Sequence, residues 1–119
     1  MRPVLLVIGI ALSGAGAAGP AAAQSIGSIA AMNHVGESMT VCGRVASATV
    51  VAQQSMQLSF DQPYPGQTFS VLILGEDRPK FNGRELAMIG RRMCGSGTIK
   101  LVQGRAQMTL KDPSRLTPE

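Results

Sequence analysis

Aromatic residues are scarce in this sequence. Among its 119 residues there is no tryptophan, and the aromatic side chains are Phe60, Tyr64, Phe69 and Phe81. A hydrophobic core must therefore be built mainly from Val, Ile, Leu, Met and Ala. Single-stranded nucleic acid is commonly held by bases that stack on aromatic side chains, so the sequence offers few contacts of that kind.

Histidine and catalytic motifs are scarce as well. His34 is the single histidine, and the two cysteines, Cys42 and Cys94, form no CxxC pair. Because zinc takes three or four protein ligands, this set argues against a metal centre. The sequence also lacks a glycine-rich phosphate loop and a nucleophile elbow. These absences predict a protein that is not an enzyme and that uses no metal or cofactor.

Charge of either sign is sparse and dispersed. The sequence has 11 Lys and Arg residues and 7 Asp and Glu residues, which gives a formal net charge of +4. The basic residues are spread along the chain, as is typical of a solvated surface. This pattern permits an anionic partner without requiring one.

The amino-terminal segment has the order of a secretion signal. Residues 1–3 carry a positive charge, residues 4–12 are apolar, and residues 13–23 are mostly small. The apolar run is about half of the roughly 20 residues that span a membrane. This length favours a cleaved signal peptide over a membrane anchor.

Small residues define the predicted cleavage site. Ala21 and Ala23 occupy the third and first positions before a cut that follows Ala23, and a cut after Ala18 is the alternative. We therefore predict a signal peptide at residues 1–23 and a single domain at residues 24–119. The expected location is periplasmic or secreted, with no stable membrane anchor after cleavage.

Both cysteines lie in the part that is predicted to be exported. An even number of cysteines in an oxidising compartment favours a disulfide. Cys42 and Cys94 have similar contexts, since each precedes a glycine and opens a predicted strand. A catalytic thiol is the alternative, with His34 as its candidate base, although a surface position suits His34 better. We predict a Cys42–Cys94 disulfide.

Apolar and polar residues alternate with a period of two in several segments, which predicts strands. The five predicted strands are residues 39–51, 56–60, 68–74, 91–99 and 105–110. Short helices are predicted at residues 26–34 and 80–89. Five short strands in about a hundred residues favour a closed barrel, because closure removes exposed sheet edges.

The order of three strands, a helix and two strands is that of an OB fold. We therefore predict an all-β domain with small α content, a five-stranded OB-fold barrel with a short helix between strands 3 and 4. The first and fourth strands are neighbours in that fold, which would bring the two cysteines together. Gln57 and Ser59 are the outward positions of the second strand. Leu72 and Leu74 face outward on the third, where we expect the helix to cover them.

The chain resembles the small secreted bacterial OB-fold proteins that are described as nucleic-acid-binding-like. Three motifs carry the resemblance. The first joins residues 34–37 (HVGE) to residues 41–45 (VCGRV), the second is residues 60–71 (FDQPYPGQTFSV), and the third joins residues 104–108 (GRAQM) to residues 112–116 (DPSRL). The resemblance implies the fold and, as a family expectation, nucleic-acid binding.

The candidate nucleic-acid-binding residues are Arg44, Tyr64, Lys100 and Arg105. OB barrels bind ligands across strands 2 and 3 and the neighbouring loops. Tyr64 has the chemistry to stack on a base, although capping of the barrel end is the favoured interpretation. The three cations are suited to phosphate contacts, and the alternative is that they are ordinary solvated side chains.

The sequence thus predicts an exported, non-catalytic OB-fold binding module. Single-stranded nucleic acid or another anionic polymer is the leading ligand, on the strength of the resemblance. An envelope protein, a glycan or a purely structural role is the alternative, because the outward positions of the second strand carry no aromatic side chain.

Overall fold

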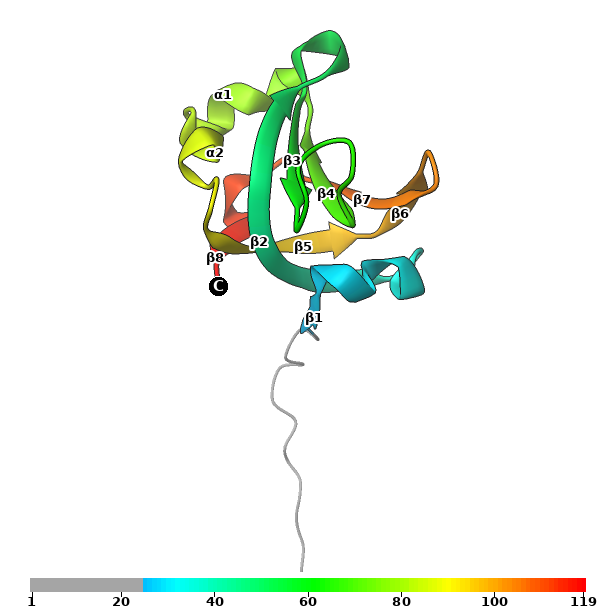
Figure 1. Ribbon diagram of the computed structural model, residues 1–119. Helices are drawn as coiled ribbons and strands as arrows, with labels where there is room; N and C mark the ends of the chain where they lie inside the picture. The colour runs from blue at the N-terminus through cyan, green and yellow to red at the C-terminus, as the bar shows by residue number, and fades with distance from the viewer. Residues whose placement is uncertain (1–24) are drawn as a thin grey trace, which may run out of the picture.

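The computed structural model describes residues 25–119 (Figure 1). The predicted signal peptide lies outside these residues. The described chain forms eight strands, which are β1 (Ser25–Gly27), β2 (Ser38–Val50), β3 (Met56–Phe60), β4 (Phe69–Ile73), β5 (Arg92–Thr98), β6 (Lys100–Val102), β7 (Arg105–Thr109) and β8 (Leu116–Pro118).

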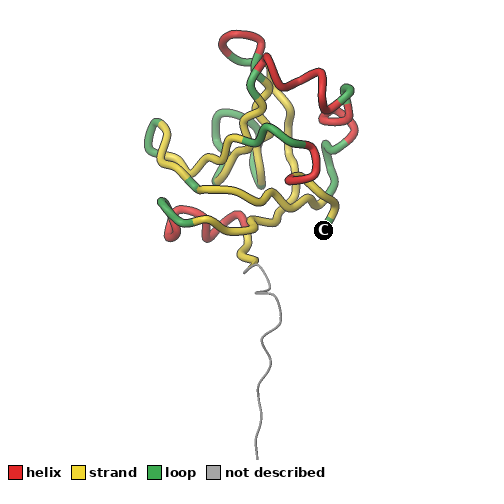
Figure 2. Tube along the Cα trace, turned by 180° about the vertical axis from the view of Figure 1, so that it is seen from behind, coloured by secondary structure: helices red, strands yellow, loops and turns green. Residues whose placement is uncertain are grey.

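The helical segments are short. Two α-helices, α1 (Arg78–Phe81) and α2 (Arg84–Ala87), follow β4, and 3₁₀ helices occur at Ser28–His34, Ala52–Gln54, Gly75–Asp77 and Pro113–Arg115. Figure 2 shows these helical segments at the periphery of the strands. In the part of the chain that the structure describes, no helix has the length and apolar character that crossing a membrane requires.

The strands form one open mixed sheet. Its order is β6-β7-β4-β3-β2-β5-β8, and β1 pairs with β2 outside this path. The pairs β1–β2 and β4–β7 are parallel, and the remaining pairs are antiparallel. The five predicted strands correspond to β2, β3, β4, β5 and β7, so the all-β class is confirmed. The closed barrel is wrong, because no ladder joins β5 to β7 within residues 25–119.

The sheet is open between β5 and β7, at the point where the chain passes from β5 to β6. β5 and β6 are separated only by Ile99, and β5 pairs with β2 whereas β6 pairs with β7. A Cβ at Gly97 would lie 3.2 Å from side-chain atoms of both Met108 and Leu110. These side chains therefore pack directly on the β5 backbone.

The long curved strand β2 connects the two halves of the sheet (Figure 1). Its first half pairs with β5 and β1, and its second half pairs with β3 after a register shift between Val45 and Ser47. Cys42 lies directly opposite Cys94 on β5, and the two sulfur atoms are bonded. The predicted disulfide and the predicted adjacency of the first and fourth strands are both confirmed.

The core lies on one face of the strands, as the period of two predicts. β2, β3 and β4 each contribute alternate apolar residues that are at most 7% exposed. These inward residues are Met39, Val41, Val45, Met56, Leu58, Phe60, Phe69, Val71 and Ile73. The rings of Phe60 and Phe69 meet edge to face, with 5.2 Å between their centroids, a geometry that aromatic pairs favour.

The predicted helix at residues 80–89 is broken into α1 and α2. Asn82 and Gly83 both have positive φ, 54° and 73°, and a left-handed residue of this kind ends a helix. The break changes which face of the segment points inward. Apolar Leu86 is 58% exposed, whereas Glu85 is 1% exposed.

The sequence pattern does not predict three short strands. β1, β6 and β8 have three residues each, too few to display a period of two. The first helix therefore begins at Ser28, after β1, and regular structure continues beyond Asp112 into β8. β8 pairs with β5, opposite Cys94 and its neighbours.

A close contact between the Ser28–His34 helix and β2 predicts one sensitive position. A Cβ at Gly43 would lie 2.1 Å from Ser28 Oγ and 2.8 Å from Ser28 Cβ. Ser28 is buried and donates a hydrogen bond of 2.7 Å to Asp61 Oδ2, so it has no free direction in which to move. We expect Gly43→Ala to lower the free energy of unfolding by about 1–3 kcal/mol.

Urea denaturation checks this expectation. Gly27→Ala is the matched control, because a Cβ at Gly27 would meet no atom within 4 Å. Equal unfolding midpoints for the two variants would show that the helix moves away from β2 without cost.

Candidate functional site

A groove of about 680 Å³ crosses the sheet face that is opposite the core. Its floor lies on β3, β4 and β7. In Figure 1 the segments around it are the turn between β2 and β3, the loop between β3 and β4, and the β6–β7 hairpin. The lining residues are Val51, Ala52, Gln53, Ser55, Gln57, Tyr64, Pro65, Gln67, Ser70, Leu72, Leu74, Val102, Gln103, Arg105 and Gln107.

Glutamine is the commonest residue in this lining, and we call the site the glutamine groove. Gln57 and Gln107 project from strands, and Gln67 comes from the loop before β4. Gln53 and Gln103 lie in the two turns, both at positive φ. The lining contains no Asp, Glu, Lys, His or Cys, so its polar groups are amides and hydroxyls with one guanidinium.

A row of polar residues runs across four strands beside the groove. Cross-strand partners share a face of a sheet, and the register aligns Ser47, Ser59, Ser70 and Gln107 in this way. Gln107 Nε2 donates to Ser70 Oγ at 3.1 Å. At the other end, the backbone N–H of Tyr64 donates to Ser47 Oγ at 3.1 Å.

These contacts correct one expectation about exposure. Gln57 and Ser59 do face away from the core, as predicted, but they are only 8% and 0% exposed. The β3–β4 loop is held to β2 on this side through Ser47. Two buried oxygen atoms here, Ser59 Oγ and Gln67 Oε1, have no hydrogen-bond partner within the described chain.

Arg105 is the single charged residue of the lining. Its Nη1 donates to the carbonyl oxygen of Gln67 at 2.8 Å. This hydrogen bond links β7 to the β3–β4 loop and uses one donor of the guanidinium.

Apolar side chains complete the groove. Leu72 and Leu74 line it, half-buried, and are not covered by the helical segment as expected. Tyr64 is 46% exposed and also lines the groove. This exposure leaves part of its surface open to solvent, and the interpretation of Tyr64 as a cap on the barrel end stays a prediction.

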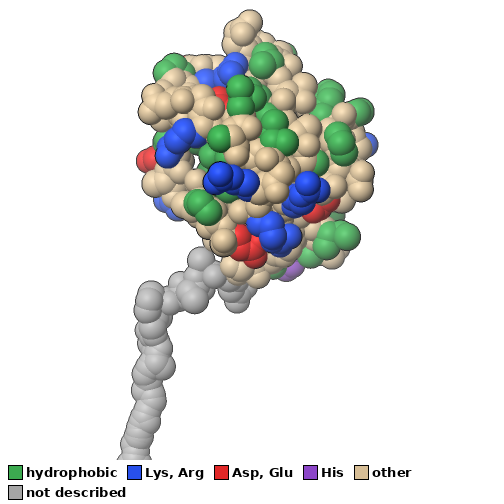
Figure 3. Space-filling view, turned by 60° about the vertical axis from the view of Figure 1, so that its left-hand side comes forward, with side chains coloured by type: hydrophobic (Ala, Val, Ile, Leu, Met, Phe, Trp, Pro, Cys, Tyr) green, Lys and Arg blue, Asp and Glu red, His purple; other side chains and the backbone are tan. Residues whose placement is uncertain are grey.

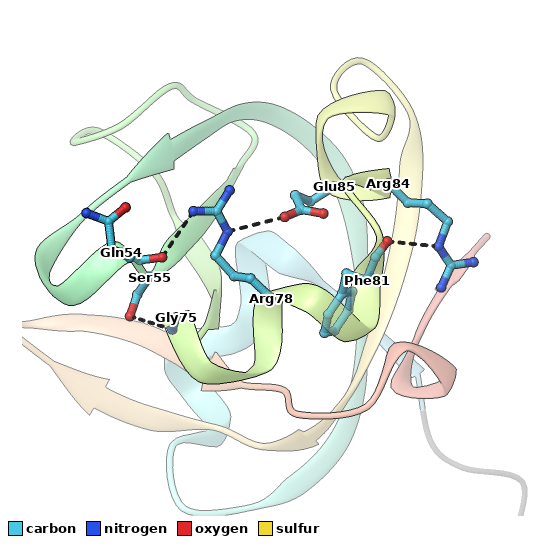
Figure 4. A network of polar contacts seen from close by, with 7 residues as sticks. All are labelled: Gln54, Ser55, Gly75, Arg78, Phe81, Arg84 and Glu85. Atoms are coloured by element: carbon cyan, nitrogen blue, oxygen red, sulfur yellow. Dashed lines mark hydrogen bonds and ion pairs between the residues drawn. The ribbon is translucent and has the colours of Figure 1, made fainter.

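The turn between β2 and β3 is held in place by contacts with the helical segment that follows β4. Figure 4 shows Arg78 between this turn and α2. Its Nη1 donates to the Gln54 carbonyl oxygen at 3.1 Å, and its Nε lies 3.4 Å from the buried carboxylate of Glu85. The backbone N–H of Gly75 donates to Ser55 Oγ at 3.2 Å. These contacts position Gln53 and Ser55 at the groove.

The structure brings together only some of the predicted binding residues. Tyr64 and Arg105 both line the glutamine groove. Lys100 is the cross-strand partner of Gln107, so it lies on the same face, outside the lining. Arg44 also lies outside the lining, opposite Arg92 on β5. The nucleic-acid-binding role of these four residues stays a prediction.

Basic side chains on another face are spread apart. Figure 3 brings forward the side that carries α1, α2 and β8, where Lys and Arg side chains alternate with hydrophobic ones and a few acidic ones. Lys80 on this helical segment pairs with Asp77 at 2.9 Å, and this hydrogen bond raises the pKa of Lys80. Such dispersed, partly paired cations form no continuous basic track.

A second hollow, of about 550 Å³, lies between β2, β5 and the segment after β7. Lys111, Asp112 and Arg115 contribute charges to it. A hydrogen bond from the backbone N–H of Ser114 lowers the pKa of Asp112. Because Asp112 offsets the neighbouring cations and none of the predicted binding residues lies here, this hollow is the weaker candidate.

One group of potential metal ligands occurs among the described residues. Cys42 Sγ, Cys94 Sγ and a Glu119 carboxylate oxygen lie within 4.8 Å of one another. The two sulfur atoms are bonded to each other, and only a thiolate is a strong metal ligand. This group is therefore the disulfide with a neighbouring carboxylate.

Comparisons with known proteins bear on the fold. No family model matches the chain, and no curated protein matches it. Among solved structures, it is similar to a putative aspartyl-tRNA synthetase from Leishmania major Friedlin, with a TM-score of 0.51 at 12% sequence identity. The architecture is consistent with an OB-like fold. The likeness covers 84% of this chain but only 22% of the synthetase, so it concerns one segment of that enzyme.

Proposed function

We propose that this protein is an exported, non-catalytic binding module that holds a polymeric ligand in the glutamine groove. The observation that carries the proposal is the groove itself, which crosses three strands and presents amides, hydroxyls and Tyr64. The corresponding face and loops of OB folds bind oligonucleotides and oligosaccharides.

Two features support export. The first 23 residues have the sequence pattern of a signal peptide, and the Cys42–Cys94 disulfide is of a kind that persists in oxidising compartments. The absence of an acid–base pair from the groove lining supports a role without catalysis, because proton transfer requires titratable groups within reach of the substrate.

A nucleic acid is a second candidate ligand. Arg105 and Tyr64 lie in one groove, which is the combination of cation and aromatic ring that single strands use. Lys100 lies on the same face, beside Gln107.

NMR chemical-shift mapping tests the proposed binding face. The protein, purified with its disulfide formed and labelled with ¹⁵N, would be titrated with the deoxyoligonucleotide dT10 and with neutral hexasaccharides. We expect a bound ligand to shift the side-chain amide signals of Gln57, Gln103 and Gln107, because these amides line the groove.

The backbone amides of Arg44 and Lys111 serve as reporters for other surfaces, since both residues lie outside the groove. Shifts that cluster around these two residues and spare the glutamine amides would show that the binding face lies elsewhere.

A further inference from the structure

We infer that the ligand of the glutamine groove is a neutral oligosaccharide. This inference rests on the function proposed above, since it names the ligand class of the same site. Four properties of the groove carry it, namely its hydrogen-bonding groups, its unpaired buried oxygen atoms, its charge and its apolar surface.

The hydrogen-bonding groups of the groove both donate and accept. Each glutamine amide has two donor hydrogens and an accepting oxygen, and each serine hydroxyl donates and accepts. Five glutamines and two serines line the groove. Sugar hydroxyls also donate and accept, so they match this set. Phosphate oxygens at neutral pH only accept, so a phosphate backbone uses only the donors of this set.

Unpaired oxygen atoms lie at the same place. Gln67, which lines the groove, is 5% exposed, and its Oε1 accepts no hydrogen bond from the described residues. Ser59 Oγ also has no partner within the described residues; Ser59 lies two residues along β3 from Gln57, opposite Ser70 and outside the lining. Buried polar atoms normally have partners, and a sugar hydroxyl that reached Gln67 would supply the donor that its Oε1 lacks.

The charge of the groove suits a neutral ligand. A single-stranded nucleic acid carries a charge on every phosphate and is held along a positively charged track. The lining has one cation, Arg105, whose Nη1 is already bonded to the Gln67 carbonyl. Arg44 and Lys100 both lie outside the lining, and Lys100 is the cross-strand partner of Gln107.

The apolar surface also suits a sugar chain. Leu72, Leu74 and Val102 lie in the lining with Tyr64, which is 46% exposed. The carbon-bound hydrogens of a pyranose ring pack on such surfaces, and one aromatic ring suffices for one sugar. Single-stranded nucleic acids instead use several aromatic rings in succession, and Tyr64 is the only aromatic residue in this lining.

Titration with defined saccharides tests the inference. The disulfide-bonded protein would be titrated with chitohexaose, cellohexaose and maltohexaose, and separately with dT10, while the glutamine side-chain amides are followed by NMR. We expect at least one hexasaccharide to bind in the groove. Because the ligand is uncharged, its dissociation constant should change less than roughly twofold between low salt and about 0.5 M salt.

Four variants test the inference at single residues. Tyr64→Ala and Gln57→Leu should each weaken saccharide binding by about fivefold or more, since each removes a contact of the lining. Tyr64→Phe should retain most of the affinity, because it keeps the ring. Arg44→Ala is the matched control and should bind as the parent does. Unfolding midpoints confirm that each variant is folded.

The outcomes separate this inference from the proposed function. If dT10 shifts the groove amides with steep salt dependence and no hexasaccharide does, the inference is overturned and the binding module stands as a nucleic-acid binder. If no probe shifts the groove amides, both are overturned. Saccharide binding that Tyr64→Ala and Gln57→Leu leave unchanged would also overturn the inference.

Discussion

Replacing both Cys42 and Cys94 by alanine is expected to lower the free energy of unfolding by about 4 kcal/mol. The disulfide joins residues that are 52 positions apart, so it restricts a long loop of the unfolded chain. Domains of this size have total stabilities of about 5–15 kcal/mol. The disulfide therefore accounts for a large fraction of the stability of this one.

Urea denaturation of the double variant, compared with the parent protein before and after reduction, measures this contribution. The reduced parent should unfold at nearly the same urea concentration as the double variant. The replacement itself opens no space in the core cluster, because the cysteines lie on the sheet face opposite Val41 and Met93. A loss below about 1 kcal/mol would show that the unfolded chain is already restricted in another way.

Phe60→Ala is expected to cost about 3–5 kcal/mol, because it removes a fully buried ring and leaves a cavity. Phe60 ends β3, and its ring packs edge to face on Phe69 of the neighbouring strand. A Cβ at Gly43 would lie 3.2 Å from the Phe60 ring, so β2 packs on the ring as well. Three strands therefore lose contacts in this variant.

The unfolding midpoint and slope in urea measure the effect. Phe60→Leu is the control, since it keeps most of the apolar volume, and we expect it to cost roughly 1–2 kcal/mol. If both variants cost the same, the ring of Phe60 contributes through its shape and not through the volume it fills. If Phe60→Ala costs less than about 1 kcal/mol, the structure around β3 collapses into the cavity.

Core packing and the groove are connected through β3 and β4. Phe60 and Phe69 are paired across these strands, and the adjacent pair is Ser59 and Ser70 on the opposite face. A slip of one residue would exchange the two faces. The burial of the two rings therefore sets the register that presents Ser70, Gln57 and Leu72 to the groove.

The sequence predicted the features that depend on neighbouring residues or on residue type. The period of two correctly identifies the inward faces of β2, β3 and β4, because each of these strands buries one side against the core. The two cysteines correctly predict the disulfide, since two cysteines admit one intramolecular pairing. The order of three strands, helical segment and two strands is also found in the structure.

Other features depend on long-range contacts that no local pattern encodes. The strands β1, β6 and β8 exist because they pair with longer strands that lie elsewhere in the chain. The predicted helix at residues 80–89 breaks at Asn82–Gly83, a sequence that also allows a left-handed turn. The sheet remains open between β5 and β7, where Met108 and Leu110 pack on the glycines of β5.

The sequence by itself determined the strand faces and the covalent link between β2 and β5, because alternation and residue type act locally. Only the tertiary structure decided the groove that we propose as the binding face. It brings together five glutamines from two strands, two turns and a loop, and it places Tyr64 and Arg105 there while leaving Arg44 outside. The physical reason is that the glutamines are separated along the chain and become neighbours only through strand pairing and loop packing.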